Sequence, residues 1–365
     1  MSDQQQDHPL PRPLQPGQGY RLPPRAYTDP AWLERERRSL FPSVWNFVGS
    51  VHELAAPGSY VTADVGPYPI VIVRGEDGQL RAFHNICRHR GARLLDGQGN
   101  CERIVCPYHR WQYALDGTLS NIPQHKTQFA DTRTQDWPLQ PVELDVWMGL
   151  VFVNPDGSAP PLQQWLGDLP ERLGAFDLES LSELARCDYH FDANWKFYVE
   201  NHIDWYHLWY THPRTLSMLD CHAGYWHQTG PHWLSFAPYK ADAGYQEPFT
   251  ALPGLNEEQR MVNAHLLFPH LPMFGGGSWF GVGLLTPLSP SQTRMSLRIW
   301  GLPGQDTEEF MASFHEITQQ EDAWMAARLQ QAASSPAFAI GPMAQRYEAP
   351  ITDFHQHYLA AMGPA

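Results

Sequence analysis

The chain has 365 residues, of which 42% are hydrophobic and 13% aromatic, so it holds ample material for packed cores and a disordered protein is not expected. A chain of this length favours two domains over one. The formal net charge of −14 is spread along the chain, which argues against nucleic-acid binding, because that function needs a basic face.

Other features of the sequence bear on where the chain works. Residues 1–7 lack the basic and apolar regions of a secretory signal, and no stretch approaches the roughly 18 consecutive apolar residues of a membrane span. Cys101, Cys187 and Cys221 do not have the spacing of a disulfide framework, which suits a reducing compartment. We therefore expect a cytoplasmic protein with neither membrane nor nucleic acid among its partners.

An arm and a helix come first in the chain. Residues 1–26 are rich in Pro and Gln and predict an extended lead-in. A helix is expected over 27–41, with Thr28 or Asp29 as its N-cap and Pro30 in its first turn.

From residue 45 to about 153 the pattern changes to short β-type runs separated by Gly, Pro and Asp. Two loops between such runs carry Cys87-x-His89 and Cys106-x-x-His109. Because each loop supplies one thiolate and one imidazole, the two loops suit a [2Fe–2S] cluster in which histidines hold one of the two irons. Zinc is the competing metal, although a zinc finger usually has its two Cys first and its two His afterwards.

These loops resemble Rieske domains, and among them the oxygenase and ferredoxin type. Respiratory Rieske proteins carry an extra Cys in each loop, and here Ala92 and Tyr108 stand at those places. Trp111 stands where a Ser would donate a hydrogen bond to a sulfur. The resemblance therefore implies a cluster of lower potential that acts as an electron donor.

Chain breakers mark a domain boundary at 154–161, which reads Asn-Pro-Asp-Gly-Ser-Ala-Pro-Pro. Beyond it we expect helices near 163–174, 194–209 and 307–333, and strands around 262–300. The predicted class is α+β, with a small all-β domain followed by a larger mixed domain. The predicted divisions are 1–44 for the arm and helix, which pack on the larger domain, then 45–155 and 156–365.

The stretch 194–213 gathers candidate metal ligands. Non-haem Fe(II) oxygenases hold the metal with two His and one carboxylate on one face. His207 follows Asp204 by three residues, which is about one helical turn. His212 lies about 140° around an ideal helix from His207, so the two converge only if the helix distorts or ends there. Pro213 favours such an end, because the residue before proline is pushed out of the α region.

With this stretch the resemblance covers most of the chain. The sequence resembles the catalytic α subunit of the Rieske non-haem iron oxygenases, whose motif Glu-Asn-x-x-Asp-x-Tyr-His-x4-His is matched at 200–212. The resemblance implies a helix-grip-like catalytic domain with an antiparallel sheet. It makes His207 and His212 iron ligands. It makes Asp204 the carboxylate that joins an iron-ligating His to the second cluster histidine, His109, of a neighbouring subunit in a ring-shaped trimer. Asn201 is expected near the metal without ligating it.

The third iron ligand of that family is a carboxylate far downstream. Residues 319–322, Gln-Gln-Glu-Asp, resemble the family's Glu-Asp step, which makes Asp322 the candidate. On a helix that begins near residue 307, Asp322 shares a face with apolar side chains and can point inward. Glu321, Glu316 and Asp353 are its rivals.

The resemblance implies one Rieske cluster and one mononuclear Fe(II) per chain, with NAD(P)H used only through a partner reductase and a ferredoxin as a further candidate carrier. It implies a terminal oxygenase that uses O2 to hydroxylate or dihydroxylate a small substrate, which the Trp-rich second half suggests is aromatic. Oxidative N- or O-demethylation, for example of a quaternary amine, is the alternative, and an electron carrier without mononuclear iron is a third. A homotrimer is expected, and a small β subunit is an open question.

Overall fold

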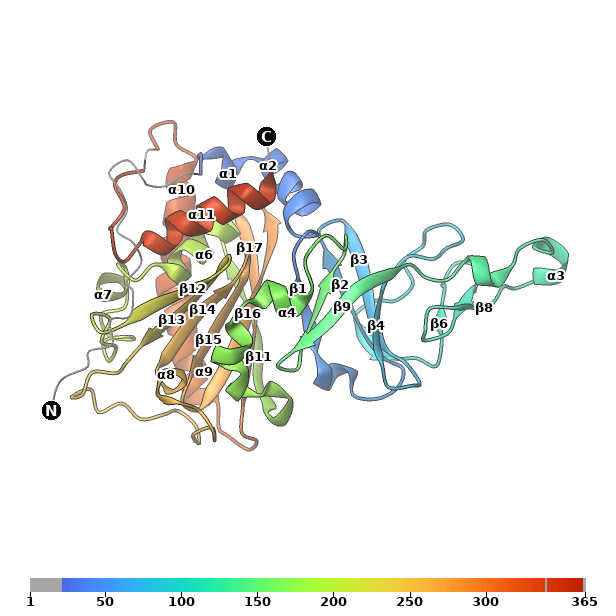
Figure 1. Ribbon diagram of the computed structural model, residues 1–365. Helices are drawn as coiled ribbons and strands as arrows, with labels where there is room; N and C mark the ends of the chain where they lie inside the picture. Colours follow the sequence, from blue (N-terminus) through green and yellow to red (C-terminus); the bar gives the residue numbers. More distant parts are fainter. Residues whose placement is uncertain (1–21, 339, 364–365) are drawn as a thin grey trace. The chain divides into compact units, whose positions relative to one another are not determined.

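The computed structural model of the protein describes residues 22–338 and 340–363 (Figure 1). Contacts divide the chain into two compact units. The β unit is Arg35–Trp165, and the mixed unit combines Met1–Glu34 with Leu166–Ala365, as far as these residues are described. The divisions fall at 34/35 and 165/166, whereas the sequence suggested 44/45 and 155/156. Most of the expected N-terminal arm, residues 1–21, lies outside the described residues.

The β unit is built on a seven-stranded antiparallel sheet in the order β1-β10-β9-β4-β3-β2-β5. Residues 70–73 of β3 are all fully buried. Because neighbouring side chains of a strand point to opposite faces, both faces of the sheet are covered at this strand. The strands are β1 (Asn46–Ser50), β2 (Ser59–Val65), β3 (Tyr68–Arg74), β4 (Leu80–His84), β5 (Gln98–Asn100), β9 (Pro141–Trp147) and β10 (Leu150–Asn154).

A smaller sheet in the β unit has the order β6-β7-β8. One core cluster contains Cys87 and Cys106 together with Val71 of the large sheet and Ile104 of the small one, so both predicted ligand loops are anchored on the same core. The small strands are β6 (Ile104–Val105), β7 (Gln112–Tyr113) and β8 (Leu119–Asn121). The short helices of this unit are η2 (Val51–Leu54), α3 (His125–Gln128) and η3 (Thr134–Asp136).

The mixed unit is built on a second seven-stranded antiparallel sheet, in the order β11-β17-β16-β15-β14-β13-β12. Its strands are β11 (Ser182–Phe191), β12 (Tyr225–Thr229), β13 (His232–Ala237), β14 (Val262–Leu267), β15 (Leu271–Gly276), β16 (Trp279–Ser289) and β17 (Gln292–Gly301). Helix α4 (Leu162–Leu166) crosses the division between the units, with all but its last residue in the β unit. The short helices of the mixed unit before and between its strands are α5 (Leu169–Leu173), η4 (Gly174–Phe176), η5 (Leu178–Ser180) and α8 (Glu257–Arg260).

Helices cover this sheet. Helices α6 (Trp195–Ile203) and α10 (Ala323–Ala333) contact its strands, and α11 (Ala349–Met362) packs on α6 (Figure 1). A small β domain together with helices on an antiparallel sheet confirms the expected α+β class.

The helix expected over 27–41 forms in three pieces, which are α1 (Arg25–Thr28), α2 (Pro30–Arg35) and the π-helical η1 (Glu36–Leu40). The side chain of Asp29 accepts a hydrogen bond from the backbone N–H of Ala31 at 2.8 Å, so Asp29 caps α2. Tyr27 stacks on Phe197 of α6 with ring centroids 4.3 Å apart, which ties this segment to the mixed unit.

The prediction of a single helix over 194–209 is wrong. Asn194 caps α6, which ends at Ile203, and a second helix, α7 (Leu208–Thr211), follows a turn. Asp204 has extended backbone angles, and its Oδ1 accepts a hydrogen bond from the backbone N–H of Tyr206 at 2.6 Å. Such a local side-chain bond competes with the helical one, which explains the break.

The long helix expected over 307–333 does form, but with an irregular middle. It consists of α9 (Glu308–His315), the π-helical η6 (Glu316–Asp322) and α10. The irregular segment carries the predicted carboxylate ligand.

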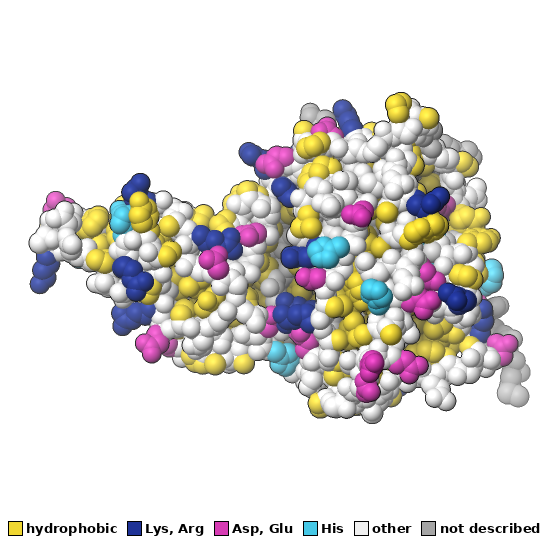
Figure 2. All heavy atoms as spheres, turned by 180° about the vertical axis from the view of Figure 1, so that it is seen from behind, with side chains coloured by type: hydrophobic (Ala, Val, Ile, Leu, Met, Phe, Trp, Pro, Cys, Tyr) yellow, Lys and Arg dark blue, Asp and Glu magenta, His cyan; other side chains and the backbone are white. Residues whose placement is uncertain are grey.

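The surface shows no large patch of one charge on the face drawn in Figure 2, where acidic and basic side chains are interspersed. Within the part of the chain that the structure describes, no helix has the length and apolar character needed to cross a membrane.

Candidate metal centres

Two similar loops of the β unit carry the predicted cluster ligands. In the loop after β4, the backbone N–H of Cys87 bonds to the carbonyl of Ala92 at 2.8 Å. In the loop after β6, the N–H of Cys106 bonds to the carbonyl of Trp111, also at 2.8 Å. The first loop closes at Gly91, whose φ of 75° suits glycine because it has no Cβ.

The four predicted cluster ligands lie together. Cys87 and Cys106 are buried and adjacent, whereas His89 and His109 are only partly buried, with ring centroids 4.7 Å apart. Burial raises the pKa of the Cys87 thiol, so a thiolate there needs a cation beside it. Nδ1 of His89 is buried and has no hydrogen-bond partner among the described residues. Iron ligation would satisfy both groups, so this donor set fits a Rieske cluster.

Sequence reasoning missed Tyr113. Its hydroxyl accepts a hydrogen bond from the backbone N–H of Arg88 at 2.9 Å and lies 3.4 Å from Sγ of Cys87, to which it can donate. Donors to cluster sulfurs raise the reduction potential, so Tyr113 partly offsets the effect inferred from Trp111. A tyrosine in a short strand is too common for the sequence alone to single it out.

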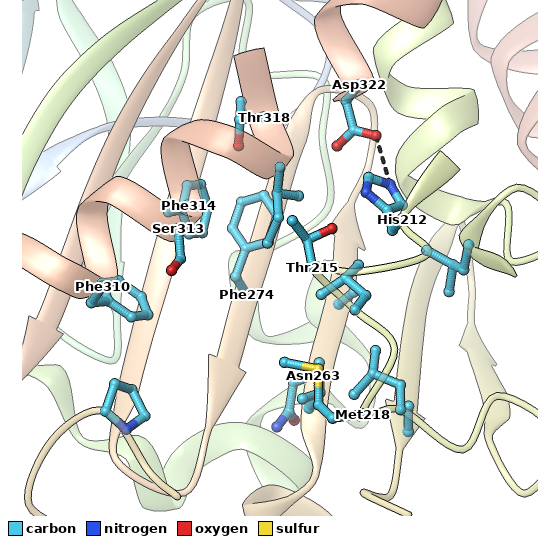
Figure 3. Close-up of a pocket in the computed structure, with 18 of the residues that line it drawn as sticks. His212, Thr215, Met218, Asn263, Phe274, Phe310, Ser313, Phe314, Thr318 and Asp322 are labelled. Carbon is cyan, nitrogen blue, oxygen red and sulfur yellow. Dashed lines mark ion pairs between the residues drawn. The ribbon is translucent and has the colours of Figure 1, made fainter. Parts of the chain in front are cut away.

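In the mixed unit, His207, His212 and Asp322 come together, and one ligand atom from each lies within 4.8 Å of the others. Oδ1 of Asp322 is 3.0 Å from Nε2 of His212 (Figure 3). The same oxygen is 3.8 Å from Nε2 of His207. His207 precedes α7, His212 follows its last residue, and Asp322 is the last residue of η6. The sequence spacing of five residues allowed His207 and His212 to converge only if the helix ended near His212, and α7 does end there.

Each imidazole is held at its other nitrogen by a second carboxylate. Nδ1 of His207 lies 3.2 Å from Oδ2 of Asp204, and Nδ1 of His212 lies 2.7 Å from Oε2 of Glu321. Because an ionised carboxylate only accepts hydrogen bonds, each Nδ1 carries the hydrogen. Each Nε2, the atom that faces Asp322, is then left to bind a metal. Metal-ligating histidines in proteins are commonly oriented in this way.

Glu321 and Asp322 are consecutive residues, yet both contact His212. They end the π-helical η6, whose wider turn rotates neighbouring side chains by a smaller angle than an α-helix does. The hydroxyl of Thr215 donates to Oε2 of Glu321 at 2.6 Å and fixes this carboxylate. The sequence made Glu321 a rival of Asp322 as iron ligand. In the structure Glu321 contacts Nδ1 of His212, the ring nitrogen that faces away from Asp322.

The other predicted residues can also be located. Nδ2 of Asn201 donates to Oδ1 of Asp322 at 2.8 Å, so Asn201 orients that carboxylate. Of the two remaining rivals, Glu316 pairs with Arg214 at 3.3 Å and Asp353 lies on α11. Neither joins the metal-compatible group found among the described residues.

The charges of this group favour a bound cation. Although burial disfavours a charged His212, the carboxylates of Asp322 and Glu321 outweigh burial and raise its pKa. Two imidazoles and one carboxylate on one side of a site, with room on the other side, match the donor set of non-haem Fe(II) oxygenases. The residues therefore fit a mononuclear iron.

His207, His212 and Asp322 line a cavity of about 740 Å³, which is large enough for a small organic molecule. In Figure 3, the side chains of α9 and η6 stand along one side of it, Phe274 and Asn263 come from the sheet, and His212 marks the side of α7. Two of the Trp residues of the second half, Trp205 and Trp279, line the cavity. The α9 and η6 residues labelled there are Phe310, Ser313, Phe314, Thr318 and Asp322.

Comparison with known proteins agrees with both centres. Residues 44–140 match the model of the Rieske [2Fe-2S] domain, and residues 178–364 match that of the ring hydroxylating alpha subunit, catalytic domain. The fold and its two sites thus define a Rieske oxygenase, an enzyme with a [2Fe–2S] cluster and a mononuclear iron that works with O2 and the electrons of a partner reductase.

Individual proteins are similar over most of the chain. The glycine betaine monooxygenase oxygenase subunit of Chromohalobacter salexigens is 29% identical, over 99% of this chain and 87% of its own length. The 2-aminobenzenesulfonate 2,3-dioxygenase subunit alpha of an Alcaligenes species is 31% identical, over 80% of this chain and 77% of its own. A crystal structure of a quaternary ammonium Rieske monooxygenase superimposes with a TM-score of 0.81 at 24% identity, covering 94% of this chain and 96% of its own, which shows the fold.

The chain belongs to the family of ring hydroxylating alpha subunits. Several further relatives are matched over less than two thirds of their own length. As a member of this family the chain is the terminal oxygenase component of a multimeric enzyme.

Proposed function

We propose that this chain is the oxygenase component of a Rieske monooxygenase that removes a methyl group oxidatively from a small methylated ammonium compound. In this proposal Cys87, His89, Cys106 and His109 hold the cluster. The mononuclear iron is held by His207, His212 and Asp322.

One observation supports the iron assignment above all others. Both histidines turn Nε2 toward Asp322 while Asp204 and Glu321 hold their Nδ1 atoms. An electron carrier has no use for such a group beside a cavity, so the carrier alternative is not favoured.

The substrate class is supported by the lining of the cavity and by relatives. Aromatic side chains and carboxylates line it together, and this combination attracts an organic cation through both cation–π and charge interactions. The Chromohalobacter relative is a glycine betaine monooxygenase. Demethylation was the alternative to ring hydroxylation from sequence, and the relatives favour it.

A bound ferrous ion supplies the site at which O2 takes up electrons. The substrate methyl group gains one oxygen atom, the other leaves as water, and NADH supplies two electrons through the reductase. The hydroxymethyl ammonium product then loses its hydroxyl proton and breaks its C–N bond, so that formaldehyde and the neutral amine leave, and this proton replaces the one consumed with NADH when water formed. The protein's part is to orient His207 and His212 through Asp204 and Glu321, and to hold the substrate cation against the aromatic wall.

We further propose that the residues and domains of this chain have the roles that the resemblance to Rieske oxygenases implies. Asp204 lies on the electron route from His109 of the neighbouring subunit in a homotrimer, and Asn201 positions Asp322. Residues 45–155 form the cluster domain and 156–365 the catalytic domain, with the N-terminal helix packing on the catalytic domain. A ferredoxin between reductase and cluster, a small β subunit and a cytoplasmic location stay predictions from sequence.

Ring hydroxylation is the second candidate, since Phe274, Phe310 and Phe314 could also stack on a planar ring. Anaerobically purified enzyme with a surrogate reductase distinguishes the two functions. We expect methylated ammonium compounds to release one formaldehyde per O2 consumed and per NADH oxidised. Coupled oxidation of neutral aromatic compounds without formaldehyde would contradict the proposal.

A further inference from the structure

The cavity that opens at the iron site is lined by charge of one sign. Among its described lining residues there are five carboxylates and no Lys or Arg side chain. The carboxylates belong to Asp204, Glu247, Asp306, Glu309 and Asp322.

The iron itself does not reverse this charge. Asp204 contacts His207, Glu321 contacts His212, and Asp322 contacts both of these histidines. Three carboxylates outweigh the two positive charges of a ferrous ion. An anionic part of a substrate therefore finds no net positive charge at this end of the cavity.

Several polar donors of the cavity lining already make hydrogen bonds within the protein. Both N–H groups of the Asn263 side chain go to backbone carbonyls, those of Gln259 and Met261. The hydroxyl of Thr215 donates to Glu321. These groups cannot turn to a substrate carboxylate without breaking their bonds.

His202 adds an acceptor instead of a donor. Its Nε2 lies 2.8 Å from the carbonyl of His265, so Nε2 carries the hydrogen and Nδ1 keeps its lone pair. Burial lowers the pKa of His202 to about 4, so the ring is uncharged near neutral pH. His202 lines the cavity in this neutral form.

A group of lining residues outside the iron ligands is suited to a cation. Tyr239 and Tyr245 stack with ring centroids 3.7 Å apart, and Glu247 is close enough to influence both hydroxyls. The carboxylate of Glu247 is held in place by the hydroxyl of Ser278 at 2.8 Å. Aromatic faces beside a fixed carboxylate are a common means of binding a quaternary ammonium group.

We propose that the natural substrate is a methylated ammonium cation that carries no carboxylate, and that Glu247 contributes to its binding. This inference rests on the proposed function and narrows it. Glycine betaine is a zwitterion, and its carboxylate would lie among like charges in a partly desolvated site, which is strongly unfavourable.

A matched pair of ligands tests the inference. Choline and glycine betaine share the trimethylammonium group. Choline carries a hydroxymethyl group where glycine betaine carries a carboxylate. We expect titration calorimetry on the holoenzyme to give a dissociation constant at least about tenfold lower for choline. With a surrogate reductase, choline should also stimulate the coupled release of formaldehyde more strongly.

Two results would contradict the inference, and they have different consequences. Equal or tighter binding of glycine betaine would overturn the carboxylate-free substrate and leave demethylation standing. Weak binding of both, with coupled turnover of a neutral aromatic compound alone, would overturn the proposed function as well.

A variant pair tests Glu247. Glu247→Gln keeps an acceptor for Ser278 but removes the charge, and it should weaken choline binding about tenfold. Glu308→Gln changes the net charge equally at an exposed α9 residue outside the cavity lining, and it should leave binding unchanged. Equal effects of the two variants would mean that Glu247 acts only through long-range charge, and would refute its place in the site.

Discussion

At the scale of single residues, two carboxylates hold the iron-site histidines without being proposed as iron ligands. The first is Glu321. Glu321→Gln keeps an acceptor for Nδ1 of His212 but removes its charge, so we expect iron affinity to fall about 10- to 100-fold. Competition with a chelator measures this affinity without any turnover. Thr215→Val, which only loosens Glu321, should give a smaller loss.

Asp204 is the second such carboxylate. Asp204→Asn should retain the cluster spectrum and most of the mononuclear iron, because the amide oxygen still accepts a hydrogen bond from Nδ1 of His207. We expect electron delivery to slow by at least about tenfold, as is typical when a residue behind a metal ligand is changed. Single-turnover oxidation of the reduced cluster with substrate and O2 present measures it. An unchanged rate would remove Asp204 from the electron route.

At the scale of elements, the π-helical η6 is the feature that aligns the iron site. Deleting Gln320, an exposed residue of η6, should restore α-helical spacing, so that Glu321 and Asp322 project about 100° apart and no longer both reach His212. We expect the deletion variant to fold and keep its cluster but to lose mononuclear iron. Gln320→Ala is the control that keeps the spacing and should keep the iron. Normal iron content in the deletion variant would show that η6 is not required.

These same elements show where sequence reasoning succeeded and where it stopped. The Cys–His spacing and the spacing of Asp204, His207 and His212 were informative because the ligands are close in sequence. Asp322 was named by resemblance. Its neighbour Glu321 was only a rival ligand, and its contact with Nδ1 of His212 was not foreseen, because a π-helical turn leaves no pattern in the sequence. The break at Asp204 was missed for a similar reason, since one side-chain hydrogen bond to Tyr206 decides it.

At the scale of the whole molecule, buried histidines make stability depend on pH. Burial lowers the pKa of His265 to about 3 and that of His270 to about 4 in the mixed unit, against an ordinary value of 6.5. Between these values the unfolded chain binds protons that the folded chain does not, so stability falls as pH decreases from 6.5. His265 and His270 should each lower the free energy of unfolding by about 2 kcal/mol at pH 5 relative to pH 7.5.

Urea unfolding at these two pH values measures the effect. His265→Gln should lose about half of the pH dependence that the two histidines account for together, whatever it does to stability at pH 7.5. Equal stability of the wild-type protein at both pH values would contradict this burial argument.

The fold also places the two candidate metal sites in separate units of one chain, and the proposed function requires iron in both. Iron and acid-labile sulfide analysis of anaerobically purified wild type and Asp322→Ala tests this most directly. We predict about three iron atoms and two sulfides per wild-type chain, and about two of each in the variant with an unchanged Rieske spectrum. Two irons in both proteins, or zinc in place of iron, would contradict it.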